Sequence, residues 1–250
     1  MNTPTLTSFI VYLLVMMSIG LFFYYRTQNL SDYVLGGRRL GPSVAALSAG
    51  ASDMSGWLLL GLPGALYAGG MSNIWIAIGL SIGAYLNWQF VAKRLRKFTV
   101  RAKDSITLPD YLENRFLDKT RILRVVSAIV ILIFFTIYVS SGLVSGAILF
   151  EKTFDMNYQL ALWVGALAIM AYTFLGGFLA VSLTDFLQGL LMFLALLVVP
   201  VLVVNNLGSR ETTVQKIGSI DSTHLNAFSG MTLFSIISLM AWGLGYFGQP

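Results

Sequence analysis

Seven apolar stretches, each long enough to cross a membrane, constrain this chain more than any other feature. An α-helix rises about 1.5 Å per residue, so about 20 apolar residues cross a hydrocarbon core about 30 Å thick. The stretches lie near 8–25, 42–67, 73–92, 122–150, 159–180, 186–204 and 228–250. The sequence therefore predicts an all-α, polytopic membrane protein with about seven transmembrane helices, in which 1–250 forms a single membrane domain.

The composition excludes several classes of protein. Hydrophobic residues make up 56% of the chain and charged residues 11%, whereas soluble domains carry about 25% charge. A water-facing enzyme or a nucleic-acid binder is therefore excluded. The absence of cysteine excludes thiol catalysis and disulfides, and the single histidine, His224, excludes a histidine-built metal centre. We expect neither an enzyme nor a cofactor.

Basic residues are distributed unevenly between the segments that join these stretches. Segments 26–41 and 93–124 hold most of them: Arg26, Arg38, Arg39, Lys93, Arg94, Arg96, Lys97, Arg101, Lys103, Arg115, Lys119, Arg121 and Arg124. The alternate segments hold Lys152, Arg210 and Lys216. Because cytoplasmic loops are enriched in Lys and Arg, we expect a plasma (inner) membrane protein with its amino terminus outside and with 26–41 and 93–124 in the cytoplasm. The same cations also suit anionic headgroups, so membrane lipids are expected partners.

Two connecting segments have patterns of their own. In 108–116 the apolar spacing, with Pro109 in the first turn, predicts a short helix at the membrane surface. Segment 205–227, which contains several Asn, Gly and Ser residues, is expected to be an outer loop. The amino terminus lacks the basic start of a cleavable signal peptide, so the first stretch is expected to be retained.

Asp53 breaks the membrane pattern, because it lies deep inside the second stretch. An ionisable group at the bilayer centre costs about 2.5–3.5 kcal/mol on insertion scales. Small and hydroxyl residues surround it, and Gly61, Pro63 and Gly64 follow, which are the weakest helix formers. These residues predict an interrupted helix whose freed backbone groups line a cavity or are buried in protein. Carbonyl and carboxylate oxygens then face a cation, and N–H groups face an anionic group.

A simpler interpretation of this stretch stays open. The small residues also allow close helix packing, and Asp53 then pairs with a cation from elsewhere.

The last stretch repeats the pattern of aromatic residues among glycines that end at a proline. Trp242 and Tyr246 are four residues apart and are expected to share a helix face, while Gly243, Gly245 and Gly248 favour a second break. Two interrupted spans are the best sequence indication of a transporter's central site. Alternatively, the two rings belong to the aromatic belt at the membrane surface.

Tyr138 is a polar residue in the fourth stretch, with Ser141 and Gly142 on its helix face. A phenol in a membrane interior needs a hydrogen-bond partner. Tyr138 is therefore either a contact between helices or part of a pocket wall.

Three segments together resemble the sodium:solute symporter family, most closely its bacterial sodium/proline branch. They are LSAGASDMSGWLLLGLPGA at 47–65, YTFLGGFLAVS at 172–182 and AWGLGYFGQP at 241–250, and the likeness extends over essentially the whole chain. The resemblance implies a LeuT-like core of five plus five helices in inverted repeats, with an additional helix at the amino terminus. Members of the family are much longer, so we expect the N-terminal half of a transporter, with the first repeat and part of the second, that cannot transport alone.

The resemblance also implies site residues. The backbone oxygens of Ala51 and Met54 are expected to bind sodium, with Asp53 required nearby and further ligands beyond residue 250. A proline pocket is implied at Ser55, Gly56, Trp57, Tyr138, Trp242, Tyr246 and Pro250. Arg38 resembles a position tied to coupling and inner gating, and it equally suits a topology charge.

The resulting hypothesis is sodium-coupled symport of L-proline into the cell by alternating access, with Na⁺ as the coupling ion. Three alternatives stay open: proton coupling, another small organic solute, and a passive channel or facilitator. An intramembrane enzyme needs a catalytic pair, and the seven stretches offer one interior carboxylate. A transporter-like sensor needs a signalling domain. Stoichiometry and oligomeric state are not predicted.

Overall fold

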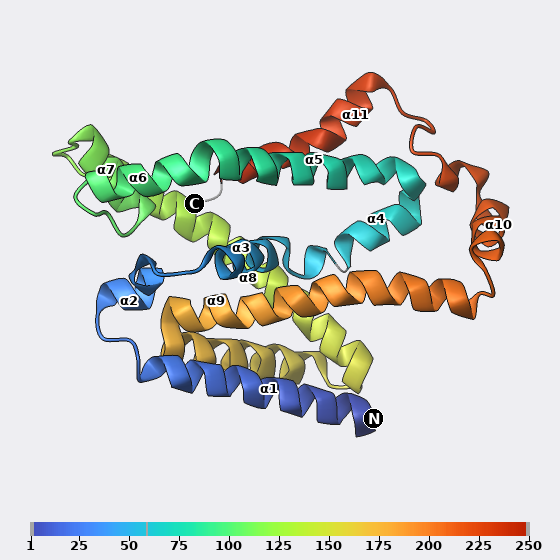
Figure 1. The fold of residues 1–250 in the computed structure, drawn as a ribbon, viewed down its shortest axis with the longest axis horizontal. Coiled ribbons are helices and arrows are strands. Elements are labelled where there is room, and N and C mark those ends of the chain that lie inside the picture. The colour runs from blue at the N-terminus through green and yellow to red at the C-terminus, as the bar shows by residue number, and fades with distance from the viewer. Residues whose placement is uncertain (1–2, 59, 249–250) are drawn as a thin grey trace. The chain divides into compact units, whose positions relative to one another are not determined.

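The chain is mostly helical in the part that the computed structural model describes, residues 3–58 and 60–248 (Figure 1). The α-helices are α1 (Thr3–Tyr24), α2 (Leu30–Leu35), α3 (Pro42–Met54), α4 (Gly61–Gly69), α5 (Ile74–Leu86), α6 (Lys93–Arg101), α7 (Leu108–Phe116), α8 (Ile122–Phe154), α9 (Tyr158–Asn206), α10 (Arg210–Ile220) and α11 (Leu233–Met240). Short 3₁₀ segments adjoin several of them, among them Ser55–Trp57 and Ala241–Gly248, and a π-helical turn joins α5 to α6. The predicted all-α class is confirmed.

Four helical stretches in the described residues are long and apolar enough to cross a membrane: Thr3–Tyr24, Gly61–Arg101, Ile122–Phe154 and Tyr158–Asn206. Of the seven predicted stretches, 42–67 and 228–250 do not form single long helices, because both are interrupted. Stretches 159–180 and 186–204 both lie in α9. A polytopic membrane protein is consistent with these helices, while the count of seven and the inverted repeats stay predictions.

The chain divides into two compact units, which are described separately below. Unit 1 consists of Met1–Gly56 and Ile122–Phe193, and unit 2 of Trp57–Arg121 and Leu194–Pro250. Whether both form the single predicted domain stays a prediction.

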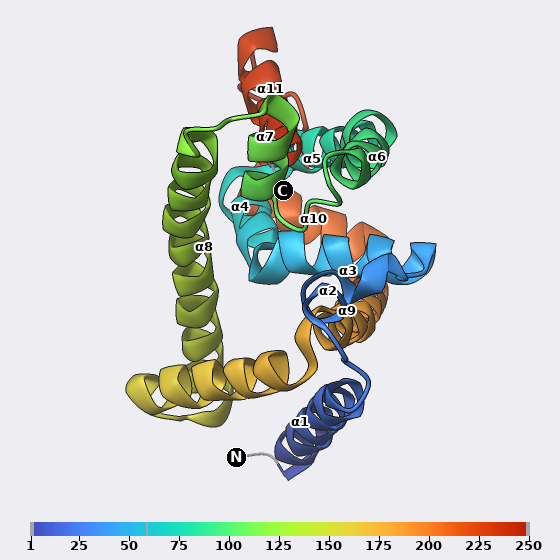
Figure 2. The same ribbon diagram turned by 90° about the vertical axis from the view of Figure 1, so that its left-hand side faces the viewer.

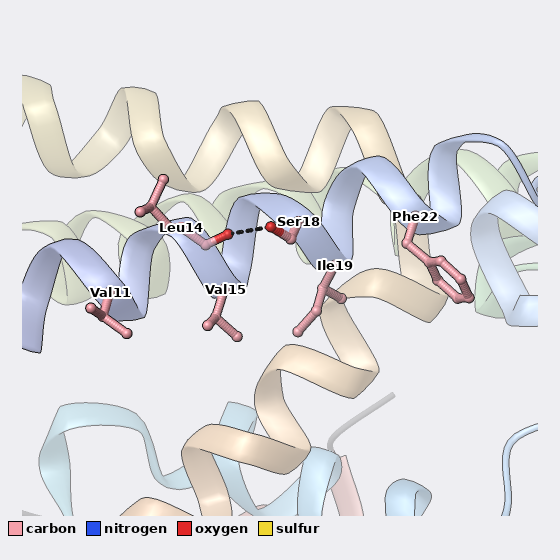
Figure 3. Close-up of a pocket in the computed structure, with 6 residues that line it drawn as sticks. All are labelled: Val11, Leu14, Val15, Ser18, Ile19 and Phe22. Atoms are coloured by element: carbon pink, nitrogen blue, oxygen red, sulfur yellow. Dashed lines mark hydrogen bonds between the residues drawn. The ribbon is translucent and has the colours of Figure 1, made fainter.

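In unit 1, α1 presents an apolar face with a shallow groove of about 390 Å³ (Figure 3). The residues that line it are Val11, Leu14, Val15, Ser18, Ile19 and Phe22. The hydroxyl of Ser18 donates to the Leu14 carbonyl at 2.6 Å, so its hydrogen bond is made within the helix. A face of this kind suits contact with lipid, where no water is available to pair with polar groups.

Helix α9 bends at Gly177, where the backbone leaves helical geometry with φ 59° and ψ −155°. Figure 2 shows α8 leading into the first half of α9 and the chain then turning sharply. Glycine adopts a positive φ without the steric cost that a Cβ imposes. A Cβ on Gly177 would also lie 2.8 Å from the Tyr33 carbonyl oxygen, and one on Gly176 3.1 Å from the Gly20 Cα. Both glycines thus allow close packing, and Gly177 in addition makes the bend.

The connecting segments contain more helix than the sequence indicated. Helix α7 matches the prediction for 108–116, and the Thr107 side chain caps its first turn. The segment 205–227, expected to be an outer loop, contains the helix α10, and its place on the outer side stays a prediction. The Ser209 hydroxyl accepts from the Thr212 amide at 3.1 Å, and this N-cap satisfies a backbone donor that a polar helix start otherwise leaves exposed.

Replacing Gly177 with alanine is expected to lower the free energy of unfolding by about 1–3 kcal/mol, because a residue with a Cβ is strained at this φ. Thermal unfolding of the purified protein in detergent measures the change. Gly142→Ala on α8 is the matched control, since a Cβ there meets no atom within 4 Å. Equal midpoints for the two variants would contradict a bend that requires glycine.

Candidate ion and solute site

The first predicted break lies at the end of α3. This helix stops at Met54, Ser55–Trp57 form a 3₁₀ turn, and α4 begins at Gly61. The last four carbonyls of an α-helix have no donor four residues further on. At α3 these carbonyls belong to residues 51–54, around Asp53. The predicted interruption is therefore confirmed.

Tyr138 of α8 holds the carbonyl end of α3. Its hydroxyl lies 2.5 Å from the Ser52 carbonyl oxygen and 3.2 Å from that of Asp53. These two oxygens lie in the last turn of α3, where its α-helical pairing ends, and the phenol donates a hydrogen bond to them there. Of the two roles left open for Tyr138, the contact between helices is present within unit 1. A role in a pocket wall stays a prediction.

Asp185 of α9 is a buried carboxyl that the sequence analysis missed. Its Oδ2 accepts from the Ser52 hydroxyl at 2.5 Å and from the Ser48 hydroxyl at 3.3 Å. Residues 181–185 were expected to join two stretches, and this expectation was wrong. The bend comes at Gly177, eight residues before Asp185, so the helix has already resumed and carries the carboxyl inside it. The Gly176–Gly177 pair is the feature of the sequence that could have indicated the bend at its true position.

Ser52 is the residue at which these contacts meet. Its hydroxyl bonds to α9 through Asp185, while its carbonyl accepts from α8 through Tyr138. Ala51, one residue earlier, packs close to Gly189 of α9, where an added Cβ would lie 3.5 Å from the Ala51 Cβ. The last turn of α3 is therefore held by two helices. Its carbonyl oxygens are hard ligands of the kind that bind Na⁺ in broken membrane helices.

The second break lies in unit 2, where α11 stops at Met240 and Ala241–Gly248 continue as a 3₁₀ helix. The break expected there takes the form of a change from α-helix to 3₁₀ helix, with no gap between the two. The expectation that Trp242 and Tyr246 share a face was wrong, because a 3₁₀ helix has three residues per turn and not 3.6. Trp242 is 54% exposed, whereas Tyr246 is 8% exposed.

Trp57 and Trp242 come together in unit 2 from residues that flank the two breaks. Their rings stack with centroids 5.7 Å apart and an interplanar angle of 26°. A Cβ on Gly61 would lie 2.7 Å from the Trp57 Nε1, so the indole lies over the start of α4 where only glycine leaves room. The pair offers an aromatic surface to a small ring.

Helix α5 packs against the segment that contains the second break. A Cβ on Gly79 would lie 2.5 Å from the Met240 Cα, and one on Gly83 2.7 Å from the Gly243 Cα. The two segments thus pack backbone against backbone, as small residues allow in membranes. The position of Trp242 therefore depends on α5.

The remaining predicted residues are placed as follows. Unit 1 holds Ala51, Asp53, Met54, Gly56 and Tyr138, and unit 2 holds Trp57, Trp242 and Tyr246. That both sets serve one site stays a prediction. Pro250 and the side chain of Ser55 lie outside the described residues.

Arg38 lies in a left-handed turn of unit 1, with φ 57°. The turn packs on α9 just after the bend, since a Cβ on Gly36 would lie 2.7 Å from the Leu179 Cδ2. Its role in gating stays a prediction.

Comparison with known proteins bears on this arrangement of two interrupted helices. The model of the sodium:solute symporter family matches residues 33–250. The chain belongs to this family. No solved structure matches it significantly.

Several curated relatives within this symporter family are proline transporters by name. The chain is 57% identical to the high-affinity proline transporter PutP of Bacillus subtilis (strain 168) over 235 residues, which are 94% of the chain and 50% of the relative. It is 55% identical to the sodium/proline symporter of Escherichia coli (strain K12) over 249 residues, 100% of the chain and 50% of the relative. The osmoregulated proline transporter OpuE of Bacillus subtilis is 48% identical over 250 residues, 100% of the chain and 51% of the relative. The chain spans about half the length of these relatives.

Replacing Tyr138 with phenylalanine removes the hydroxyl and keeps the ring. We expect the free energy of unfolding to fall by about 0.5–1.5 kcal/mol, the usual worth of one hydrogen bond. Chemical unfolding in detergent measures it. Tyr85→Phe, at a tyrosine that is 64% exposed, is the control, and equal losses for both variants would show that the hydroxyl does not hold α3.

Proposed function

We propose that this chain is part of a secondary active transporter that carries L-proline into the cell together with Na⁺ by alternating access. The observation that carries the proposal is the end of α3 at Met54, with its carbonyls turned to the Tyr138 hydroxyl at 2.5 and 3.2 Å. Membership of the symporter family and the names of the relatives support the coupling ion and the substrate.

Sodium binds at the carbonyl end of α3 in this proposal. The backbone oxygens of Ala51 and Met54 are its ligands, and the Asp53 carboxylate adds a negative charge beside it. A helix C-terminus carries about half a negative charge, which favours a cation there. Tyr138 and Asp185 hold this turn in place, so its oxygens need little rearrangement to bind the ion.

Proline binds at residues of the two breaks. Its carboxylate is recognised by N–H groups at Ser55, Gly56 and the start of α4, because a helix N-terminus favours an anion. Its ring packs on the stacked indoles of Trp57 and Trp242, with Tyr246 and Pro250 completing the pocket. Binding of either ligand orders the same stretch of chain, so each raises the affinity for the other by the same factor.

The membrane potential drives accumulation. One net charge moving through 100 mV supplies about 2.3 kcal/mol, which corresponds to a roughly fifty-fold concentration ratio before any sodium gradient is counted. Arg38, in the turn against the bend of α9, is assigned to the inner gate that closes during this cycle.

We place the protein in the plasma membrane with its amino terminus outside and segments 26–41 and 93–124 in the cytoplasm. Contacts inside each unit agree with this topology. Tyr33 bonds to the carbonyls of Thr173 and Phe174 next to the α9 bend, and both segments are expected on the cytoplasmic side. Trp75 donates to the Ala227 carbonyl at 3.0 Å, and both residues are expected toward the outside.

Uptake of labelled proline by the full-length protein in proteoliposomes tests the function. At fixed pH and an imposed potential, we expect accumulation that saturates and that requires external sodium. Replacement of sodium by choline should abolish it. Accumulation that persists in choline and follows a proton gradient would contradict sodium coupling, and flux without saturation would indicate a passive facilitator.

The Asp53→Asn variant tests the ion site. It removes the charge and keeps the shape, so we expect the sodium concentration for half-maximal uptake to rise at least tenfold, the effect of about 1.4 kcal/mol. Asp155→Asn is the control, because Asp155 is exposed in the turn between α8 and α9. An unchanged sodium dependence in Asp53→Asn would refute the role given to this carboxylate.

A further inference from the structure

One face of α6 in unit 2 carries five cations and no acidic residue. Lys93, Arg94, Arg96, Lys97 and Arg101 are all exposed, whereas Leu95, Phe98, Thr99 and Ala102 are half-buried. At 3.6 residues per turn, the exposed cations lie on one side of the helix and the half-buried residues on the other. The helix is therefore sharply divided into a basic and a packed face.

A few contacts from α7 and from the loop before it reach the packed face of α6. The Arg115 guanidinium lies 4.7 Å from the centre of the Phe98 ring. The Ser105 amide donates to the Thr99 carbonyl at 3.0 Å, and the Asn114 side chain donates to the Ser105 hydroxyl at 3.0 Å. These contacts fix the rotation of α6 about its axis, so its cations stay on the outer side.

The basic face begins where a membrane-crossing helix ends. Backbone angles stay helical from Leu86 through the π-helical turn to Lys93, and Gly61–Arg101 forms one candidate span. Residues 74–92 rise about 28 Å, close to the thickness of the hydrocarbon core. A span of that length would place Lys93 and the cations after it at the headgroup layer. Figure 1 shows the continuous course from α5 to α6.

We propose that this face of α6 is a binding site for the headgroups of anionic phospholipids. Lys93, Lys97 and Arg101 follow one another at intervals of four residues, a spacing at which like charges repel. With no acid in α6 to offset them, the compensating charge comes from outside the helix. Basic segments directly beside a membrane-crossing helix bind anionic lipids, and the lipid surface is the polyanion that lies next to this one.

Lipid binding at α6 also acts on the second break. Helix α5, which continues into α6, packs backbone against backbone on Met240 and Gly243. A headgroup that holds α6 at the membrane surface thus restrains the segment that carries Trp242. This consequence rests on the proposed function, and it predicts that anionic lipid changes the proline concentration for half-maximal uptake.

The experiment titrates phosphatidylglycerol, with phosphatidylcholine as the reference, into the full-length protein in a neutral detergent and counts bound lipid by native mass spectrometry. The test variant is Lys93→Gln/Lys97→Gln/Arg101→Gln. The matched control is Lys103→Gln/Lys119→Gln/Arg124→Gln, which removes the same charge from the same segment outside α6. Circular dichroism and thermal unfolding verify that both variants are folded.

We expect the unaltered protein to prefer phosphatidylglycerol, and this preference to weaken at high salt, because exposed charges are screened. Each cation removed from α6 should weaken binding about fivefold, and the triple variant roughly a hundredfold. The control should keep most of the affinity. Equal losses in both variants, or no preference between the two lipids, would overturn the proposal. So would binding of a single-stranded oligonucleotide to the same cations in place of phosphatidylglycerol.

Uptake separates this proposal from the function on which its consequence rests. In vesicles with rising fractions of phosphatidylglycerol, the half-saturating proline concentration should shift for the control and stay constant for the α6 variant. Absent proline uptake in every protein would refute the proposed function and leave the lipid titration to decide the α6 site. Uptake with the same lipid dependence in both variants would refute the effect on the second break.

Discussion

An α-helix that ends inside a membrane leaves carbonyl groups that hydrocarbon cannot satisfy, and the structure of unit 1 is arranged around that constraint. The end of α3 is accommodated because α8 supplies the Tyr138 hydroxyl and because Asp185 of α9 anchors the preceding turn through Ser48 and Ser52. The oxygens that make the break costly are also the ligands that the proposed sodium site would use, so the structural cost and the proposed ion binding share one origin.

The second break is stabilised differently. There Gly79 and Gly83 let α5 approach the backbone of Met240 and Gly243. Polar contacts fix the orientation of individual oxygens, as an ion site requires. Close backbone packing instead fixes where the segment that carries Trp242 lies on α5.

The residue types within short segments of the sequence predicted where α-helices are interrupted. Asp53 with Gly61 and Pro63 indicated the first break, and the glycines around Trp242 indicated the second, because helix propensity and membrane solvation are properties of short segments. What replaces the lost hydrogen bonds comes from distant parts of the chain and was not predictable in the same way. Asp185 was missed because residues 181–185 were expected to join two stretches, whereas the bend lies at Gly177. The different exposures of Trp242 and Tyr246 followed from a 3₁₀ period that no composition rule indicated. Helix α10 shows the same limit, since it begins at the Ser209 N-cap inside a connecting segment for which no helix was predicted.

The central claim is that ion and solute meet at one gap in the hydrogen-bonded backbone of α3. Calorimetric titration of the full-length protein tests it most directly, with proline added in sodium and in choline, and sodium added with and without proline. The account predicts that sodium lowers the dissociation constant for proline and that proline lowers the constant for sodium by the same factor. A proline affinity that is equal in sodium and choline would contradict it.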